Sequence, residues 1–212
     1  MSFSKHVILG NGRFPTNAIP LQILHNATTI ICCDGAADSL LAHGIIPTII
    51  IGDMDSISIK TKTKFQEKII VNTSQETNDQ TKAVEWAISQ GLQDVVILGS
   101  TGLREDHAIG NIALLLDYAK QVSVCSVSDY GIFTPIFTSQ EFESFVGQQV
   151  SLFCITPETK FNSNNLKYPL QDLQLTSWWM GTLNESLSNS FQLQFENGKV
   201  IVFQAFELKR SN

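Results

Sequence analysis

Several short apolar runs in this chain end close to polar residues that carry chemistry. The polar residues that follow these runs, directly or after a short loop, are Asp34, Asp53, Asp55, Asp79, Arg104, Asp106 and His107. If the runs are parallel strands, all of these side chains lie at the carboxyl edge of one sheet, where open α/β folds bind ligands. Carboxylates that converge there repel each other unless a cation joins them. Oxygen ligands of this kind suit Mg²⁺ and a phosphate-bearing ligand.

The first part of the chain alternates between strand-like and helix-like segments. The strand-like runs are short and rich in Ile and Val, and they cover Val7–Leu9, Thr28–Cys33, Thr48–Ile51, Ile69–Val71, Val95–Leu98 and Val122–Val127. The clearest helix begins near Thr77, which has capping-box spacing to Gln80, and stops at Gly91. A second helix follows Asp106. Alternation of this kind predicts a parallel sheet with helices on its faces, in a Rossmann-like α/β domain over residues 1–128.

After about Ser128 the pattern changes to strands without intervening helices. Phe191–Phe195 alternates apolar and polar residues, and Asn197-Gly198 then leads into the apolar run Val200–Phe203. Asn-Gly between two such runs is the strongest short-range signal for a β-hairpin, so a hairpin is predicted here. We expect residues 129–212 to form a small all-β sandwich domain.

The composition is that of a folded globular protein, with 43% hydrophobic and 16% charged residues. A net charge of -6 disfavours binding to nucleic acid, which requires a basic face. No apolar run approaches the ~18 residues of a membrane helix, and Val7–Leu9 is too short for the core of a secretory signal. The four cysteines include no C-x-x-C pair, which is typical of free thiols in a reducing compartment. We therefore expect a cytoplasmic protein without nucleic-acid or membrane partners.

Two acidic elements favour a metal site. Asp53 and Asp55 are two residues apart directly after a predicted strand, so both can reach one cation or its waters. Asp is also a common turn residue, because its side chain hydrogen-bonds its own backbone. Asp34 and Asp79, expected at neighbouring strand ends, favour the metal interpretation. Lys82 lies on the same helix face as Asp79, either as an exposed ion pair or as a point charge for phosphate oxygens.

The densest polar cluster follows the fifth apolar run. Gly99–Gly102 is a Gly- and Ser-rich loop that feeds a helix, so its backbone N–H groups suit phosphate. Arg104 adds a fork of donors for the same oxygens. No G-x-x-x-x-G-K-[ST] segment occurs, and Gly10-Asn11-Gly12 is followed by Arg13-Phe14-Pro15, which breaks the dinucleotide-binding fingerprint.

Taken in order along the chain, these segments resemble the thiamine pyrophosphokinase (thiamine diphosphokinase) family. Cys33–Ala37 is similar to the family's A-D-G-G-A segment, and Pro47–Ile57 to its P-D-x-I-I-G-D-x-D-S-I motif. Asn78–Ala83 resembles T-D-x-x-K-A, and Gly102–Asn111 resembles G-R-x-D-H…N. In the second half, Leu166–Leu170 and Asn184-Glu185 resemble G-L-K-W-P-L and S-N-E. The resemblance spans nearly the whole chain.

Three positions depart from the family pattern. Asn78 stands where Thr is usual, Tyr168 where Trp is common, and Leu183 in place of the Ser of S-N-E. The departures at Tyr168 and Leu183 concern the thiamine side of the expected site.

The resemblance implies transfer of the β,γ-pyrophosphoryl group of ATP to the hydroxyl of thiamine, giving thiamine diphosphate and AMP. It also implies Mg²⁺, a homodimer, an ATP-binding α/β domain and a β-sandwich that binds thiamine. The implied residues are Asp53, Asp55 and Asp79 for the metal; Asp34, Gly35, Lys82, Ser100, Thr101, Arg104, His107 and Asn111 for ATP; Asp79, Lys82, Arg104 and Asp106 for catalysis; and Tyr168, Trp178, Trp179, Asn184 and Glu185 for thiamine. Asp106 is expected either to orient or deprotonate the hydroxyl or to bind the metal.

Two other functions stay open at this point. Asp53-x-Asp55 after a strand is also the metal motif of nucleotide-sugar glycosyltransferases, although that function leaves Arg104, Asp106 and His107 unexplained. A non-catalytic module that senses thiamine or nucleotide would bind both ligands without releasing AMP.

Overall fold

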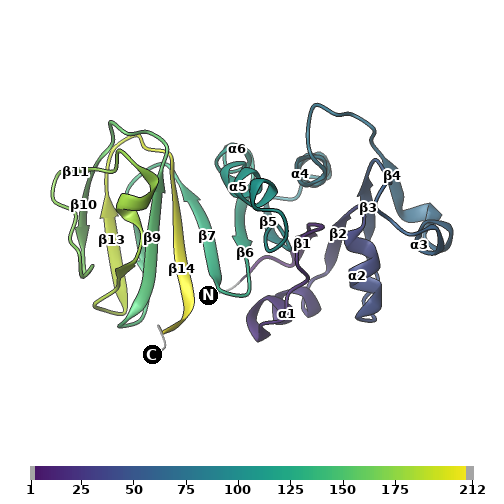
Figure 1. Cartoon of the computed structure of the whole chain (residues 1–212), viewed down its shortest axis with the longest axis horizontal. Helices are drawn as coiled ribbons and strands as arrows, with labels where there is room; N and C mark the ends of the chain where they lie inside the picture. Colours follow the sequence, from purple (N-terminus) through teal and green to yellow (C-terminus); the bar gives the residue numbers. More distant parts are fainter. Residues whose placement is uncertain (1–2, 209–212) are drawn as a thin grey trace. The chain divides into compact units, whose positions relative to one another are not determined.

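The computed structural model describes residues 3–208 of the 212-residue chain. The chain divides into two compact units, and the boundary in the sequence falls between Asp129 and Tyr130. The first is an α/β unit and the second is built from antiparallel strands (Figure 1). The predicted fold class, an α/β part followed by a small all-β part, is confirmed. None of the helices in the described part combines the length and apolar character that a membrane span requires.

The first unit contains a parallel sheet in the order β6-β5-β1-β2-β3-β4. Its strands are β1 (His6–Leu9), β2 (Thr29–Cys33), β3 (Ile49–Gly52), β4 (Ile69–Val71), β5 (Asp94–Leu98) and β6 (Ser123–Val127). The order reverses at β1, because β2 to β4 follow on one side and β5 and β6 lie on the other. The apolar runs are continuous because the central strands are buried on both faces.

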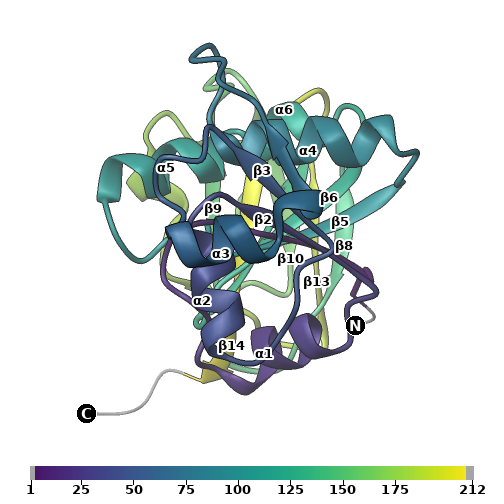
Figure 2. The ribbon, with the colours of Figure 1, turned by 90° about the vertical axis from the view of Figure 1, so that its right-hand side faces the viewer.

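Helices cover both faces of this sheet. They are α1 (Ala18–His25), α2 (Ala36–Ala42), α3 (Ile59–Lys64), α4 (Asp79–Ser89), α5 (Glu105–Ala113) and α6 (Leu115–Tyr118), with a 3₁₀ turn η1 (Gln66–Lys68) before β4. Figures 1 and 2 show α4, α5 and α6 on one side of the strands and α1 and α2 on the other. This is the doubly covered sheet that the alternating sequence pattern predicts.

The predicted capping box at the start of α4 is wrong by one residue. Asn78, not Thr77, is the N-cap, and its Oδ1 accepts a hydrogen bond from the N–H of Thr81 at 2.9 Å. An Asn side chain satisfies an orphan N–H of the first turn as well as Thr does. Gln80 is buried instead of reaching back to the cap, and its amide donates to the carbonyl of Asn111 at 3.2 Å.

The second unit consists of two antiparallel sheets around one core. One sheet has the order β12-β9-β14-β7 and the other β11-β10-β13-β8. The strands are β7 (Gly131–Ile136), β8 (Gln140–Glu143), β9 (Gln148–Cys154), β10 (Lys160–Asn164), β11 (Leu173–Gln174), β12 (Asn184–Glu185), β13 (Ser190–Gln194) and β14 (Val200–Leu208), with the 3₁₀ turn η2 (Trp178–Gly181) before β12.

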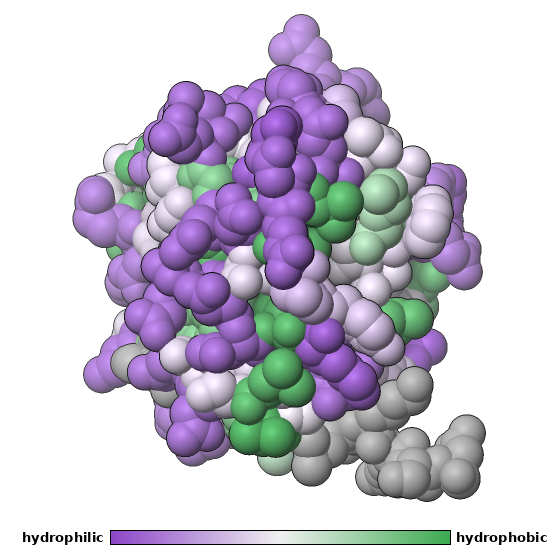
Figure 3. Space-filling model, turned by 90° about the vertical axis from the view of Figure 1, so that its left-hand side faces the viewer, coloured by the Kyte–Doolittle hydropathy of each residue, from purple (hydrophilic) through white to green (hydrophobic). Residues whose placement is uncertain are grey.

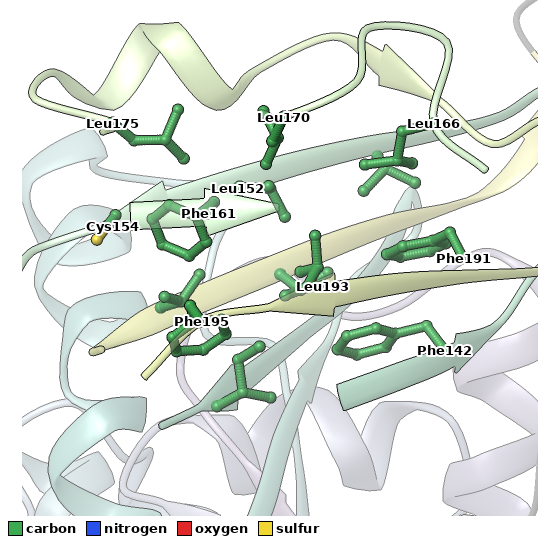
Figure 4. Close-up of a cluster of buried hydrophobic side chains, with 14 residues drawn as sticks. Phe142, Leu152, Cys154, Phe161, Leu166, Leu170, Leu175, Phe191, Leu193 and Phe195 are labelled. Carbon is green, nitrogen blue, oxygen red and sulfur yellow. The ribbon is translucent and has the colours of Figure 1, made fainter. Parts of the chain in front are cut away.

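Apolar side chains from both sheets meet in this core (Figure 4). Phe161 of β10 and Phe191 of β13 are fully buried, and Phe191 stacks on Phe142 with 5.1 Å between ring centroids. The alternate residues of β10, such as Lys160 and Asn162, face solvent. Figure 3 views the molecule from the side of these strands and shows a mostly hydrophilic surface with separate apolar patches. The alternation of apolar and polar residues therefore gives this sheet one buried face and one face in solvent.

The hairpin predicted at Asn197-Gly198 is wrong. The strand before the turn, β13, pairs with β8 and β10, whereas the strand after it, β14, pairs with β7 and β9. Asn197 does adopt a left-handed φ of 49°, so the turn chemistry is as expected. β13 and β14 both place apolar residues in the same core. Between them the chain crosses from one sheet to the other, so the two strands do not pair with each other.

We expect Leu193→Ala to lower the free energy of unfolding by about 2–5 kcal/mol, because Leu193 is fully buried between the sheets. The control is Leu187→Ala in the same unit, where the side chain is 53% exposed, and which we expect to change stability by no more than about 0.5 kcal/mol. Urea unfolding of the two variants measures the difference. Equal losses would contradict the assigned core.

Candidate active site

Three carboxylates gather at the carboxyl edge of the first sheet. Asp34 follows β2, and Asp53 and Asp55 follow β3. One oxygen from each lies within 4.8 Å of the others, and no second group of this kind occurs among the side chains described, those of residues 3–206. The three oxygens form a hard donor set, which is the kind that Mg²⁺ prefers. The residues present therefore fit a divalent cation.

Asp34 organises the loop that carries the other two carboxylates. Its carboxylate accepts hydrogen bonds from the N–H groups of Ser56 at 3.0 Å and Ile57 at 3.1 Å. Its own N–H donates to the carbonyl of Ile51 at 2.9 Å, and its φ of 44° turns the chain sharply off β2. Only 2% of Asp34 is exposed. A single buried carboxylate thus joins the ends of β2 and β3.

The electrostatic environment of Asp34 is unfavourable to its negative charge. Burial raises the pKa of its carboxyl group, and the neighbouring Asp55 and Asp79 raise it further, while the N–H of Ser56 acts in the opposite direction. A bound cation would remove this conflict, because it favours the ionised form of every carboxylate around it.

Asp79 and Lys82 adjoin this cluster from the first turn of α4. The Nζ of Lys82 lies 2.9 Å from Oδ1 of Asp79, and the lysine side chain is only 3% exposed. A Cβ on Gly52 would lie 2.9 Å from the Cβ of Asp34 and 3.2 Å from the Cγ of Asp79. The absence of a side chain at Gly52 therefore lets both Asp34 and Asp79 lie close to the end of β3. The structure groups Asp34 with Asp53 and Asp55, whereas Asp79 is bonded to Lys82.

Glycine loops lie beside the point where the strand order reverses. The N–H of Gly10 donates to the carbonyl of Leu98, and the N–H of Gly12 donates to that of Gly99, both at 2.8 Å. A Cβ on Gly12 would lie 2.4 Å from the Gly99 oxygen, so only glycine permits this approach. The loop after β1 is thus packed on the loop after β5 at the switch point of the sheet, where α/β folds bind ligands.

Ser100 lies in the loop after β5, and Asn111 of α5 holds its backbone. Ser100 is buried and its hydroxyl lies 2.7 Å from that of Ser126 on β6. The Nδ2 of Asn111 donates to the carbonyl of Ser100 at 2.9 Å. Thr101 is half-buried and His107 is exposed on α5. Gly35 is buried, and a Cβ there would lie 2.8 Å from the amide of Asn11.

Arg104 and Asp106 form an exposed bidentate pair. The Nε of Arg104 lies 3.1 Å from Oδ1 of Asp106, and one terminal nitrogen lies 2.6 Å from Oδ2. The hydrogen bonds from Arg104 lower the pKa of Asp106 to about 2. Asp106 is therefore a weak base in this arrangement. The guanidinium group of Arg104 can bind another anion only after it separates from Asp106.

The residues predicted for the thiamine side lie in the second unit. Asn184 is buried, and its Oδ1 accepts from the N–H of Tyr168 at 3.1 Å while its Nδ2 donates to the Tyr168 carbonyl at 2.8 Å. Glu185 accepts from Lys167 at 3.2 Å. Tyr168, Trp178 and Trp179 are exposed. Asn184 therefore holds the backbone of Tyr168, and the three aromatic rings are left facing solvent within their own unit.

Sequence reasoning missed three parts of this site. The Gly10–Gly12 segment breaks the dinucleotide fingerprint and is not predicted to belong to the site, although a Gly-x-Gly after the first strand is a usable signal. Lys62 reaches from α3 to the carbonyl of Met54, at 3.1 Å, and Met54 has a left-handed φ of 67°. Nothing in the sequence identifies Ser126, because only the fold shows that this strand residue contacts Ser100.

The fold and site define a class of protein: an open parallel α/β unit with three clustered carboxylates at its carboxyl edge, followed by an antiparallel β unit. The family model described as "Thiamin pyrophosphokinase, catalytic domain" matches residues 21–126. The one described as "Thiamin pyrophosphokinase, substrate-binding domain" matches residues 131–203. The chain belongs to the thiamin pyrophosphokinase family.

Individual relatives agree with this. A thiamine pyrophosphokinase of Bacillus subtilis is 26% identical over 205 residues, which cover 90% of this chain and 94% of the relative. A crystal structure of thiamine pyrophosphokinase from Bacillus subtilis has a TM-score of 0.80 at 22% identity, covering 96% of this chain and 100% of the other. That of thiamin pyrophosphokinase from Candida albicans has a TM-score of 0.76 at 18% identity, covering 94% and 89%. The structural matches establish a shared fold.

We expect Gly52→Ala to lower thiamine pyrophosphokinase activity by about 10²-fold, because the added Cβ displaces Asp34 and Asp79. Gly110→Ala on α5 is the control, since a Cβ there meets no atom within 4 Å. Steady-state kinetics of both variants measure the effect. Full activity of Gly52→Ala would contradict the close approach of the two carboxylates.

A second expectation concerns stability against pH. Asp38 on α2 accepts hydrogen bonds from the backbone and hydroxyl of Ser58, at 2.7 and 2.6 Å, and from the hydroxyl of Thr61. Burial alone would raise the pKa of Asp38, but these hydrogen bonds lower it below its usual value. Its contribution to stability is therefore complete above the unfolded pKa of about 4 and is lost as the pH falls through the lower folded value.

Asp38→Ala should consequently lower the urea midpoint at pH 7, and the difference from the unsubstituted protein should shrink towards pH 3. Asp117→Ala removes the exposed ion pair between Asp117 on α6 and Lys120; it serves as the control and should have little effect at either pH. A pH-independent loss in Asp38→Ala would show that the carboxylate charge does not matter.

Proposed function

We propose that this chain transfers the β,γ-pyrophosphoryl group of ATP to the hydroxyl of thiamine, releasing AMP. The observation that carries the proposal is the carboxylate cluster of Asp34, Asp53 and Asp55 beside the buried Lys82, in a chain of this family. Transfer of a phosphorylated group requires positioning and charge stabilisation more than covalent chemistry by the protein. A site rich in fixed charges and backbone donors suits that requirement.

Asp34, Asp53 and Asp55 would hold Mg²⁺, with Asp79 beside them. When bound, Mg²⁺ supplies positive charge that offsets the charge on the pyrophosphoryl oxygens. The role of Asp34 extends beyond ligation, because it also fixes the loop of Asp53 and Asp55 through Ser56 and Ile57.

Lys82 would contact the phosphate oxygens from the first turn of α4. Its ammonium group is buried and held by one carboxylate, so it is pre-oriented and loses little freedom on binding. Arg104 would add a second cation by exchanging Asp106 for phosphate oxygens. We infer that Asp106 orients Arg104 before this exchange, because its carboxylate holds the guanidinium group in a bidentate pair.

The loop after β5 would supply backbone N–H groups to ATP, together with Gly35, Ser100, Thr101 and His107. The thiamine side would be formed by Tyr168, Trp178 and Trp179 of the second unit. Their exposed rings suit the cationic thiazolium ring of thiamine. Asn184 would act by holding Tyr168, and Glu185 by its charge.

We further propose a homodimer, which the family resemblance implies, and a cytoplasmic location. All four cysteines are free, as expected in a reducing compartment. Size measurement by light scattering tests the dimer. The glycosyltransferase and the non-catalytic sensor are not favoured, because membership of this family accounts for both halves of the chain.

The direct test is AMP release from ATP and Mg²⁺ with and without thiamine. We expect AMP only when thiamine is present. Formation of ADP would mean simple phosphoryl transfer, and binding of thiamine without any product would favour a sensor. Either result would overturn the proposal.

We expect Asp55→Ala to lower the thiamine-dependent rate by about 10²-fold or more while the fold is retained, because it removes one charged ligand of the proposed cation. Asp117→Ala serves again as the control, since Asp117 lies on α6 outside the carboxylate cluster. Near-normal turnover of Asp55→Ala would rule out its role at the metal.

A further inference from the structure

A chain of hydrogen bonds links two parts of the site that are far apart in sequence. On α5, Asn111 uses its Nδ2 to bind the carbonyl of Ser100, at 2.9 Å, and its Oδ1 to accept from the Nδ2 of Asn78, also at 2.9 Å. Asn78 is the N-cap of α4, and its own Oδ1 accepts from both the N–H and the hydroxyl of Thr81 at 2.9 Å. The nitrogen and the oxygen of the Asn111 amide are therefore each bound to the protein by one hydrogen bond.

The two ends of this chain are anchored in the core. Ser100 is fixed to β6 through its hydroxyl contact with Ser126, at 2.7 Å. Thr81 is fixed to α6 through the hydroxyl of Tyr118, also at 2.7 Å. Buried Gln80 adds a parallel link by donating to the carbonyl of Asn111. The loop after β5 and the first turn of α4 are thus held at a defined separation.

The residues that this chain positions are those of the proposed function. Asp79 directly follows the cap, and Lys82 lies on the same first turn, whereas Ser100 begins the loop proposed to cradle the phosphates. A shift of the helix start relative to this loop would move the Lys82 ammonium away from the oxygens that it must meet. Misplacement by about 1 Å is enough to cost a large factor in rate.

We propose that Asn78 and Asn111 form a positioning pair, in which Asn111 acts on the reaction through Asn78 and the Ser100 carbonyl and not by contacting ATP. The proposal rests on the proposed function for its kinetic consequence. It also assigns a role to a departure of this chain from its family pattern. The amide of Asn78 caps α4 with its oxygen while donating to Asn111 with its nitrogen, so one side chain provides both links.

The test is a double-mutant cycle. Asn78→Ser keeps a capping oxygen but removes the donor to Asn111, and Asn111→Ala removes the shared acceptor. We expect each single variant to lower kcat/KM for ATP about tenfold, with KM for thiamine unchanged. The double variant should be no worse than either single one. Asn17→Ser, at the N-cap of α1, is the matched control and should leave the kinetics unchanged.

Three results would overturn the proposal. Multiplicative losses in the double variant would mean that the two residues act independently. A loss in Asn111→Ala with normal Asn78→Ser would mean direct contact between Asn111 and ATP. Losses that merely follow lowered stability in urea unfolding would mean a structural role alone.

Amide hydrogen exchange separates this proposal from the proposed function. In Asn78→Ser, exchange should increase in the segment 99–104, which lies on a different element from the substitution. This result is expected whether or not the protein releases AMP. Unchanged exchange in that segment would overturn the positioning pair, whereas absence of AMP from the unsubstituted protein would overturn only the reaction.

Discussion

The site depends on one buried carboxylate that the fold holds in an unfavourable environment. Asp34 is almost completely buried beside other acidic groups, yet it accepts two backbone N–H groups from the loop after β3. Replacing it by an apolar residue would leave Ser56 and Ile57 without their acceptor and would release the loop of Asp53 and Asp55. The same charge that builds the loop also creates the need for a cation. Loop geometry and ligand affinity are therefore coupled at a single residue.

Much of the fold follows from local sequence patterns. The Ile- and Val-rich runs predict the strands of the first sheet because those strands are buried on both faces and need no alternation. The second unit is less predictable. The apolar pattern of β13 and β14 indicates that both strands face a core, but it does not indicate which strands they pair with. Asn197-Gly198 fits a hairpin and equally fits a crossing between two sheets, and pairing is decided by β7, β8, β9 and β10.

The residues of the site likewise divide into those that the local sequence predicts and those that it does not. Asp53 and Asp55 are predictable because their ligand spacing and their place after a strand are local properties. Asp34 was predictable as a nearby acid but not as the residue that organises the loop, since its partners lie more than twenty residues away. Lys62, Ser126 and the link between Asn78 and Asn111 depend on contacts between distant elements. A single Lys, Ser or Asn is common in any sequence, and the residues around it do not indicate which distant residue it contacts.

The account centres on the cluster of Asp34, Asp53 and Asp55 as the place where a divalent cation meets the phosphates of ATP. The most direct measurement is calorimetric binding of an α,β-methylene analogue of ATP, which cannot transfer its pyrophosphoryl group, with saturating Mg²⁺ and with EDTA. We predict that Mg²⁺ tightens this binding about tenfold or more in the unsubstituted protein and that Asp53→Ala loses this dependence on Mg²⁺. An undiminished dependence on Mg²⁺ in Asp53→Ala would contradict the account.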